Sequence, residues 1–378
     1  MKIFNQELIN LSLRMFNVTL SQDKGNTKNL AVSPYSFSQV LGLLANGTTD
    51  DETSNKFLAK MGFEPNISKF NENSMNFNEN LSSNTKNNNE FFVKNFLLHR
   101  DEFTINEDFK TLSSNFYNTK ISSYSPANMI KDLDNFNNLV ANETKNVVKE
   151  AISDFSSNIC LLIMNILYLK QEWLTKFNFC RVEDFTSFSG KVKQEMMHQY
   201  EVSKYNSYED DKMIAILMRY KKSNLSFVAV MPKNIEDWDE VTAKICSKNE
   251  LSYLISKMEY GNVNLTFPKF NYEYESNFSA YSKDLGIDSM LDSLKLNKLI
   301  TYFKYENLRI KQKVIIDVNE FGTIAYAKTI ALCTDGPGPR NVRVMQFNKP
   351  FLWFVINQDD NFTCSTPIFM GKYLGPKK

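Results

Sequence analysis

The sequence predicts an α+β fold in which a helical N-terminal region packs on large mixed β-sheets and one loop near the C-terminus is exposed. Amphipathic helix patterns are frequent in the first 155 residues, whereas strand patterns dominate from residue 185 onward. A third observation is a run at residues 323–333 in which small and large side chains alternate. A chain of this length can bury one large core, and we expect residues 1–378 to form a single domain.

The N-terminal region begins with two predicted helices. The first lies near residues 1–17 and has an apolar face formed by Leu8, Leu11, Leu13, Met15 and Phe16. The second begins at Ser33 and Pro34, because serine caps a helix and proline fits its first turn. Residues 71–90 are mostly polar and contain too few apolar side chains to order a core by themselves. We therefore predict a loop or a frayed helix there.

The rest of the chain is dominated by strand patterns. Residues 92–99 are typical of a strand, and a helical pattern then continues through Phe136, Leu139, Val140, Val147 and Val148. Residues 159–169 are almost continuously apolar, which is typical of a strand covered on both faces. We predict further strands at residues 225–231, 263–270, 313–318, 351–357 and 366–373.

Composition argues against several kinds of partner. The formal net charge is +1, so no electrostatic argument supports a nucleic-acid or membrane partner, and residues 71–90 carry too few basic side chains to suggest a heparin site. No stretch reaches the length of a membrane span. Residues 1–17 lack the pattern of a signal peptide, so we expect a cytoplasmic protein or one released without a conventional signal peptide. The five cysteines have no paired spacing, and we expect reduced thiols at Cys160, Cys180, Cys246, Cys333 and Cys364.

The residue inventory also argues against an enzyme. The chain has no GxSxG, GxxxxGK[ST], GxGxxG or HExxH motif. A Ser-His-Asp or Cys-His arrangement would need His99 or His198, the only histidines, and we expect structural roles for both. No cluster of Cys and His suggests a metal site, and we expect no cofactor.

The alternating run at residues 323–333 is the most informative segment. Every second residue is small, namely Thr323, Ala325, Ala327, Thr329, Ala331 and Cys333. Because a strand sends successive side chains to opposite faces, this segment could enter the middle of a packed sheet with its small face inward. The Gly, Pro and Arg residues at 336–340 are typical of an exposed loop. The sequence therefore predicts a loop that can become a strand.

At this segment the chain resembles a known family. Residues 318–329, VNEFGTIAYAKT, are similar to the hinge of the serpins, which are suicide-substrate protease inhibitors. Similar stretches occur in the family's order along nearly the whole chain, at residues 29–36, 165–168 with Trp173 and Phe177, 267–270, 285–287, 347–352 and 369–372 with Pro376. Leu139, Asn146, Gln312 and Trp353 depart from the residues that the family usually has.

The resemblance implies the serpin fold and a monomeric inhibitor of serine proteases. In this mechanism the protease attacks the exposed reactive centre loop and forms an acyl-enzyme ester. The cut loop then inserts into the central β-sheet before water hydrolyses the ester, and this conformational change traps the protease. The target protease is the expected partner. Two alternatives stay open: inhibition of an Asp-directed or other cysteine protease, and a non-inhibitory binding or scaffold protein of the same fold.

The resemblance also assigns roles to individual residues. The hinge and reactive centre loop correspond to residues 319–346, with hinge positions at Glu320, Gly322, Thr323, Ala325, Ala327 and Thr329. Lys269 and Glu320 match an ion pair at the top of the sheet, the region called the breach, which also holds Trp173. A polar cluster under the middle of the sheet, called the shutter, corresponds to Ser33, Ser36 and Asn165, with Gln312 in place of the usual histidine.

The scissile bond has more than one candidate. Counting forward from Glu320 by analogy with the family gives Gly336, or Asp335 for a loop one residue shorter. Counting backward from Phe347 leads to Pro339, beside Arg340 and Asn341. Arg340 would suit a trypsin-like protease and Asp335 an Asp-directed one. The two counts disagree because the loop is about three residues longer than in common family members, by the same analogy.

Overall fold

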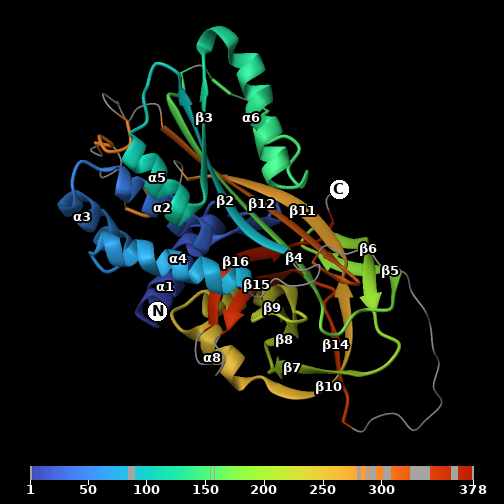
Figure 1. Cartoon of the computed structure of the whole chain (residues 1–378). Coiled ribbons are helices and arrows are strands. Elements are labelled where there is room, and N and C mark those ends of the chain that lie inside the picture. Colours follow the sequence, from blue (N-terminus) through green and yellow to red (C-terminus); the bar gives the residue numbers. More distant parts are fainter. Residues whose placement is uncertain are drawn as a thin grey trace.

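The computed structural model describes residues 2–83, 90–153, 155–156, 158–278, 282–286, 288, 295–300, 308–323, 341–358 and 365–376. Helices gather in the N-terminal part of the chain, and two β-sheets contain residues from all parts of it (Figure 1). The described helices are α1 (Lys2–Ser21), α2 (Pro34–Gly47), α3 (Asp51–Met61), α4 (Ile67–Ser83), α5 (Glu107–Tyr117), α6 (Met129–Glu143), α7 (Trp238–Ile245) and α8 (Glu250–Lys257).

The sheet that positions the site has six strands. Its order is β11 (Phe270–Asn277), β12 (Leu308–Asn319), β13 (Gly322–Thr323), β4 (Leu161–Glu172), β2 (Glu90–Arg100) and β3 (Thr119–Tyr124). Because β13 has only two residues, β12 and β4 also pair with each other over most of their length.

The second sheet has ten strands and shares the main buried cluster with the first. Its order is β1 (Leu30–Val32), β16 (Ser365–Tyr373), β15 (Phe351–Gln358), β9 (Leu225–Pro232), β8 (Met213–Arg219), β7 (Ser203–Glu209), β10 (Glu259–Pro268), β6 (Gly190–His198) and β5 (Phe179–Ser187), and β14 (Arg343–Gln346) pairs with β10.

Strand β4 is covered on both faces, as its apolar sequence predicts. Leu161, Ile163 and Leu167 belong to the main buried cluster, which also includes side chains of α1, α2 and the ten-stranded sheet. Leu162 and Met164 belong to a second cluster beneath α6, on the opposite face. In Figure 1 α6 lies across that face of the six-stranded sheet.

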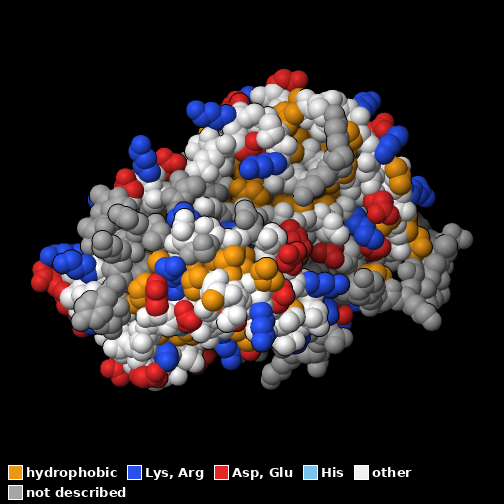
Figure 2. Space-filling model, turned by 90° about the horizontal axis from the view of Figure 1, so that it is seen from above, with side chains coloured by type: hydrophobic (Ala, Val, Ile, Leu, Met, Phe, Trp, Pro, Cys, Tyr) orange, Lys and Arg blue, Asp and Glu red, His pale blue; other side chains and the backbone are white. Residues whose placement is uncertain are grey.

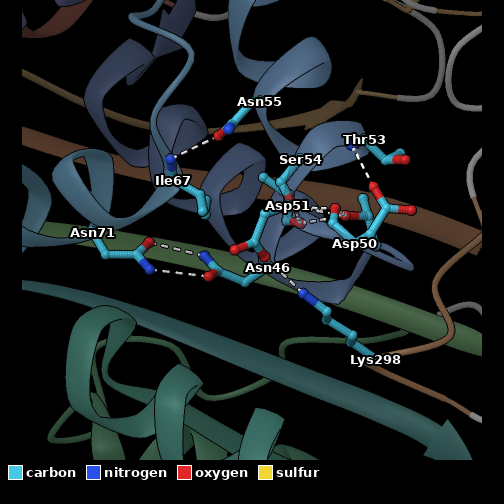
Figure 3. A network of polar contacts seen from close by, with 11 residues as sticks. Asn46, Asp50, Asp51, Thr53, Ser54, Asn55, Ile67, Asn71 and Lys298 are labelled. Atoms are coloured by element: carbon cyan, nitrogen blue, oxygen red, sulfur yellow. Dashed lines mark hydrogen bonds and ion pairs between the residues drawn. The ribbon is translucent and has the colours of Figure 1, made fainter.

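Of the two alternatives predicted for residues 71–90, the loop is wrong for residues 71–83, which form most of the helix α4. The helix packs through Phe70, Phe77 and Leu81, and its polar side chains also find partners on α2. Asn71 and Asn46 exchange two amide hydrogen bonds of 2.9 and 3.0 Å (Figure 3). Apolar content alone underestimates the order of this helix, because matched buried amides also hold it in place.

Two predicted element boundaries also need correction. The helical pattern was extended to Val147 and Val148, but α6 ends at Glu143, because Lys145 and Asn146 adopt left-handed backbone with φ of 52° and 61°. Asparagine tolerates this conformation at a helix end. The predicted strand at residues 263–270 is divided at Lys269, where β10 ends and β11 begins.

A buried ion pair joins the loop after α1 to β16. The side chains of Lys372 and Asp23 are 0% and 5% exposed, and Lys372 Nζ lies 2.9 Å from Asp23 Oδ2. Burial by itself would raise the pKa of Asp23, but hydrogen bonds from Thr27, Lys372 and Lys28 outweigh burial and hold this pKa well below its usual value. Burial lowers the pKa of Lys372.

Replacing Asp23 with Asn is expected to lower the free energy of unfolding by about 3–5 kcal/mol, because Lys372 would stay buried without its counter-charge. Since the pKa of Asp23 is depressed in the folded state, its contribution is present above about pH 4 and is lost as the pH falls through the folded pKa. Urea unfolding at pH 7 and pH 3 measures both effects. Asp51→Asn is the control, because Asp51 is 73% exposed in its pair with Lys298 and should matter little. Equal losses in the two variants would contradict this prediction.

Candidate functional site between β4 and β12

The candidate site is the seam where β4 and β12 meet in the six-stranded sheet. The two strands pair in parallel from Leu308 opposite Leu161 to Val314 opposite Leu167. Above this point β13 lies between them, because Thr323 pairs antiparallel with Val318 of β12 and with Gln171 of β4. Thr323, the first residue of the alternating segment, therefore already occupies the upper end of the seam.

Gly322 fits this position because no side chain could. A Cβ atom built there would lie 2.0 Å from the carbonyl oxygen of Gln171, and the backbone φ is +159°. Any larger residue would have to push β13 away from β4. Glycine at this hinge position thus permits the close approach of the two strands.

Thr323 is fully buried, and its hydroxyl lies 2.9 Å from the hydroxyl of Tyr220. Tyr220 stacks on Trp173 with a ring separation of 4.8 Å and an interplanar angle of 8°. Burial raises the pKa of Tyr220 far above the physiological range, so the contact joins two neutral hydroxyls. The alternating sequence pattern predicted that Thr323 faces inward, but it did not predict Tyr220 as the partner of its hydroxyl.

The structure brings the predicted breach residues together around the start of the hinge. Lys269 Nζ lies 3.0 Å from Glu320 Oε2, and Trp173 Nε1 donates to the carbonyl of Asn319 at 2.9 Å. Burial would raise the pKa of Glu320, but a backbone hydrogen bond and Lys269 outweigh burial and lower it. Burial, followed by the negative charge of Glu320, raises the pKa of the neighbouring Cys180 thiol to about 11, so this cysteine is not a reactive thiolate.

The predicted shutter residues form two separate groups. Gln312 Oε1 accepts from the backbone N–H of Ser33 at 2.9 Å, and its Nε2 donates to the Ser33 carbonyl at 2.9 Å and the Ser36 hydroxyl at 3.1 Å. Asn165 is opposite Gln312 in the strand register, yet its Nδ2 donates to Asn95 Oδ1 at 2.8 Å. Its own Oδ1 has no hydrogen-bond partner among the described residues.

The expectation of one polar cluster is therefore corrected to two groups, one on each side of the seam. Asn95 is a member that the sequence analysis missed. Its signal was an isolated amide in the otherwise apolar strand pattern FVKNFLLH. Gln171, fully buried beside Thr323 with both amide atoms unpartnered in the described structure, was also missed.

The remaining candidate residues lie at or beyond the limits of the described chain. Ala325, Ala327, Thr329, Asp335, Gly336 and Arg340 are outside the described residues. Asn341 is exposed, with φ of 57°, and it directly precedes the approach to β14. Residues 324–340 are thus attached to the body at both ends: at Thr323 in the seam and at β14 on β10.

The described cysteines and both histidines lie outside the seam or have structural contacts. Cys160, Cys180 and Cys246 are free thiols, whereas Cys333 and Cys364 are outside the described residues. His99 lies beside the carbonyl of Arg100, and His198 pairs with Glu183 at 2.8 Å. Within the described ranges, no helix has the length and hydropathy of a membrane span, and no group of side chains is arranged to hold a metal. Basic and acidic side chains are interspersed on the face drawn in Figure 2.

Comparison with known proteins identifies the family. The family model described as serpin (serine protease inhibitor) matches residues 6–376, and the chain belongs to this family. Serpin B12 of Homo sapiens is 26% identical, with 92% of this chain and 94% of the relative covered. Serine protease inhibitor A6 of Xenopus laevis is 24% identical, with 99% and 84% covered. The predicted family is thus confirmed.

Solved structures confirm the predicted fold class. Human glycosylated kallistatin superposes with a TM-score of 0.85 at 20% sequence identity, covering 98% of this chain and 97% of that one. The thermophilic serpin Tengpin in its native state gives 0.83 at 22% identity, covering 99% and 94%. Serpins are generally protease inhibitors rather than enzymes, and they act on target proteases.

Proposed function

We propose that this serpin inhibits serine proteases as a suicide substrate, by inserting its cut loop between β4 and β12. The observation that carries the proposal is a match of polarity between the loop and the seam. The antiparallel register of Thr323 with Val318 and Gln171 can be continued downward, one loop residue for each residue of β4 and β12. Each inward-facing loop position then meets a defined pair of buried side chains.

Six residues below Thr323, the continued register places Thr329 level with Gln312 and Asn165, which are themselves paired. These two amides are polar, and the threonine is the only hydroxyl residue among the lower inward positions. Ala325, Ala327, Ala331 and Cys333 meet apolar pairs instead: Ile316 and Leu169, Val314 and Leu167, Ile310 and Ile163, and Leu308 and Leu161. Small apolar residues thus fall where the seam is apolar, and threonine where it is polar.

This match also explains why insertion would be favourable. Each ladder hydrogen bond contributes about 0.5–1.5 kcal/mol net, and the strand would add bonds to both neighbours. The hydroxyl of Thr329 could donate to Asn165 Oδ1, which has no hydrogen-bond partner among the described residues of the uncut protein. An unsatisfied buried acceptor costs about 1–3 kcal/mol, so the seam holds strain that the loop would relieve.

The described ion pairs leave the seam free to open. Lys311 and Lys313 of β12 pair with Glu275 and Glu273 of β11 at 2.7 and 2.9 Å. On the other side, Lys94 of β2 pairs with Glu143 of α6 at 2.8 Å. The first two pairs join strands on the same side of the seam, and the third joins β2 to α6. Parting β4 from β12 would therefore break their shared ladder without breaking these pairs.

The length of the seam bears on the scissile bond. Its lower end, at Leu308 and Leu161, is level with Cys333 in the continued register. A cut after Asp335 or Gly336 would leave two or three residues between the sheet and the protease, whereas a cut after Arg340 would leave seven. Because a short tether pulls the protease against the body, we favour Asp335 or Gly336. An Asp-directed protease, serine or cysteine, then becomes the first target class to test.

The test is incubation with trypsin, chymotrypsin, elastase, cathepsin G, granzyme B and a caspase, followed by denaturing gel and mass spectrometry of the released C-terminal peptide. We expect an SDS-stable complex with one enzyme and a peptide that begins at Gly336 or Pro337. A peptide beginning at Asn341 would instead identify Arg340 as the residue before the scissile bond. Asp335→Ala and Arg340→Ala form a matched pair, of which only the first should abolish inhibition by an Asp-directed enzyme. Cleavage by every enzyme without any complex would contradict inhibition and favour a non-inhibitory protein.

A further inference from the structure

One end of the molecule carries both attachments of residues 324–340 and two exposed apolar side chains. Leu174 follows β4 directly beyond the residues that pair with β13, and it is 59% exposed. Tyr260 of β10 is 65% exposed. Continuing the β10–β14 register by two residues places Asn341 level with Gly261, the neighbour of Tyr260. In Figure 1 β7, β10 and β14 lie together at the lower end of the view, away from α6.

A small pocket lies between these two side chains. Leu174, Tyr260, Tyr205 and Leu217 contribute its apolar lining, and its volume is about 80 Å³. Sites for drug-sized ligands span about 300–1,000 Å³, so this pocket can take one side chain of a partner but not a small-molecule ligand. Two exposed apolar side chains at the rim of one pocket could enclose an apolar anchor side chain of a partner. We call it the flanking pocket.

The charged residues of the flanking pocket are both basic. Lys204 and Arg219 line it, and Arg219 Nη2 donates to Asn206 Oδ1 at 3.3 Å, which orients the guanidinium. Lys204 is exposed on β7. A partner surface that places an apolar side chain in the pocket and an Asp or Glu beside it would be complementary in shape and charge.

We propose that the flanking pocket is an exosite for the body of the target protease, which would insert an apolar side chain next to a carboxylate. This inference rests on the proposed function. The position of the pocket identifies the occupant, because an enzyme engaged on residues 324–340 must lie over the end where Thr323 and Asn341 leave the body. The contact would speed formation of the encounter complex and would not take part in loop insertion.

The experiment measures the second-order rate constant of inhibition with the protease that forms the stable complex. The double variant Leu174→Ala, Tyr260→Ala is expected to lower this constant about tenfold, since buried anchor side chains dominate interface affinity. Lys204→Glu should lower it severalfold at low salt and less at high salt, because exposed charges act mainly on encounter rates. The stoichiometry of inhibition should stay at the wild-type value in both, because the hinge is unchanged.

Ile130→Ala and Lys131→Glu are the matched controls. Both residues are exposed on α6, far from the loop attachments, and their rate constants should equal that of the wild type. Thermal unfolding checks that all variants keep the wild-type stability. Normal inhibition with unchanged rate constants in the pocket variants would overturn the exosite alone. Failure of the wild-type protein to inhibit any protease would overturn the proposed function and the exosite with it.

Discussion

Thr323→Arg is expected to convert the protein from an inhibitor into a substrate. Thr323 is fully buried in the seam, and its hydroxyl contacts Tyr220. An arginine would be displaced from the seam in the uncut protein, and carrying it back into the sheet after cleavage would bury an unpaired charge, which costs several kcal/mol. Each 1.4 kcal/mol of barrier slows a step about tenfold, so insertion should become at least about a hundredfold slower. Water would then hydrolyse the acyl-enzyme ester before the loop inserts.

The measurement is the stoichiometry of inhibition together with the yield of SDS-stable complex. We expect the stoichiometry to rise from near one to above about ten, with the released peptide unchanged in sequence. Ile324→Arg is the matched control, because the alternation places residue 324 on the opposite face of an inserted strand, level with the partly exposed Lys170 and Asp317. Equal inhibition by the two arginine variants would contradict insertion in this register.

The hydroxyl contact can be tested separately from the charge. Tyr220→Phe removes the hydroxyl opposite Thr323 and keeps the ring that stacks on Trp173. It should free the hinge from the seam and leave the inserted register unchanged, so it should alter the rate of inhibition more than its stoichiometry. Thr323→Ser keeps the hydroxyl and should behave like the wild type in both measurements.

The sequence was sufficient to predict the burial of Thr323, because a period of two is a local property of a strand. The burial of both faces of β4 was predicted from its almost continuous apolar run. The contact of Lys269 with Glu320 was predicted from family resemblance alone, since no local pattern joins residues 51 positions apart.

The errors concern partners brought together by the tertiary fold. Neither α4 nor the division of the shutter into two groups could be inferred from periodicity. Both depend on hydrogen bonds between side-chain amides of separate helices and strands. Asn71 needs Asn46, and Asn165 bonds to Asn95 rather than to the Ser33 group. Gln312 stands where the family usually has a histidine. Both atoms of its side-chain amide are hydrogen-bonded within the Ser33 and Ser36 group, which keeps that group separate from Asn165.

Cleavage of the loop is expected to raise the melting temperature by at least about 10 °C, because the new strand adds ladder bonds on both sides and satisfies buried groups of the seam. The protein can be cut by a protease that it does not inhibit, and the uncut and cut forms compared by calorimetry. A non-inserting protein would melt at the same temperature in both forms. An unchanged melting temperature after complete cleavage would therefore contradict the insertion mechanism and favour the non-inhibitory alternative.

The register itself is tested by Thr329→Val, which preserves shape and removes the hydroxyl. If Thr329 inserts level with Asn165, the variant should destabilise the cleaved form by about 1–3 kcal/mol and leave the uncut form unchanged. Lys328→Ala is the control, because the alternation turns its side chain to the face of the inserted strand opposite Asn165. A double-mutant cycle with Asn165→Leu should then give a coupling energy of about 0.5–3 kcal/mol in the cleaved form and none in the uncut form. Coupling absent from both forms would mean that the loop, even if it inserts, does so in another register.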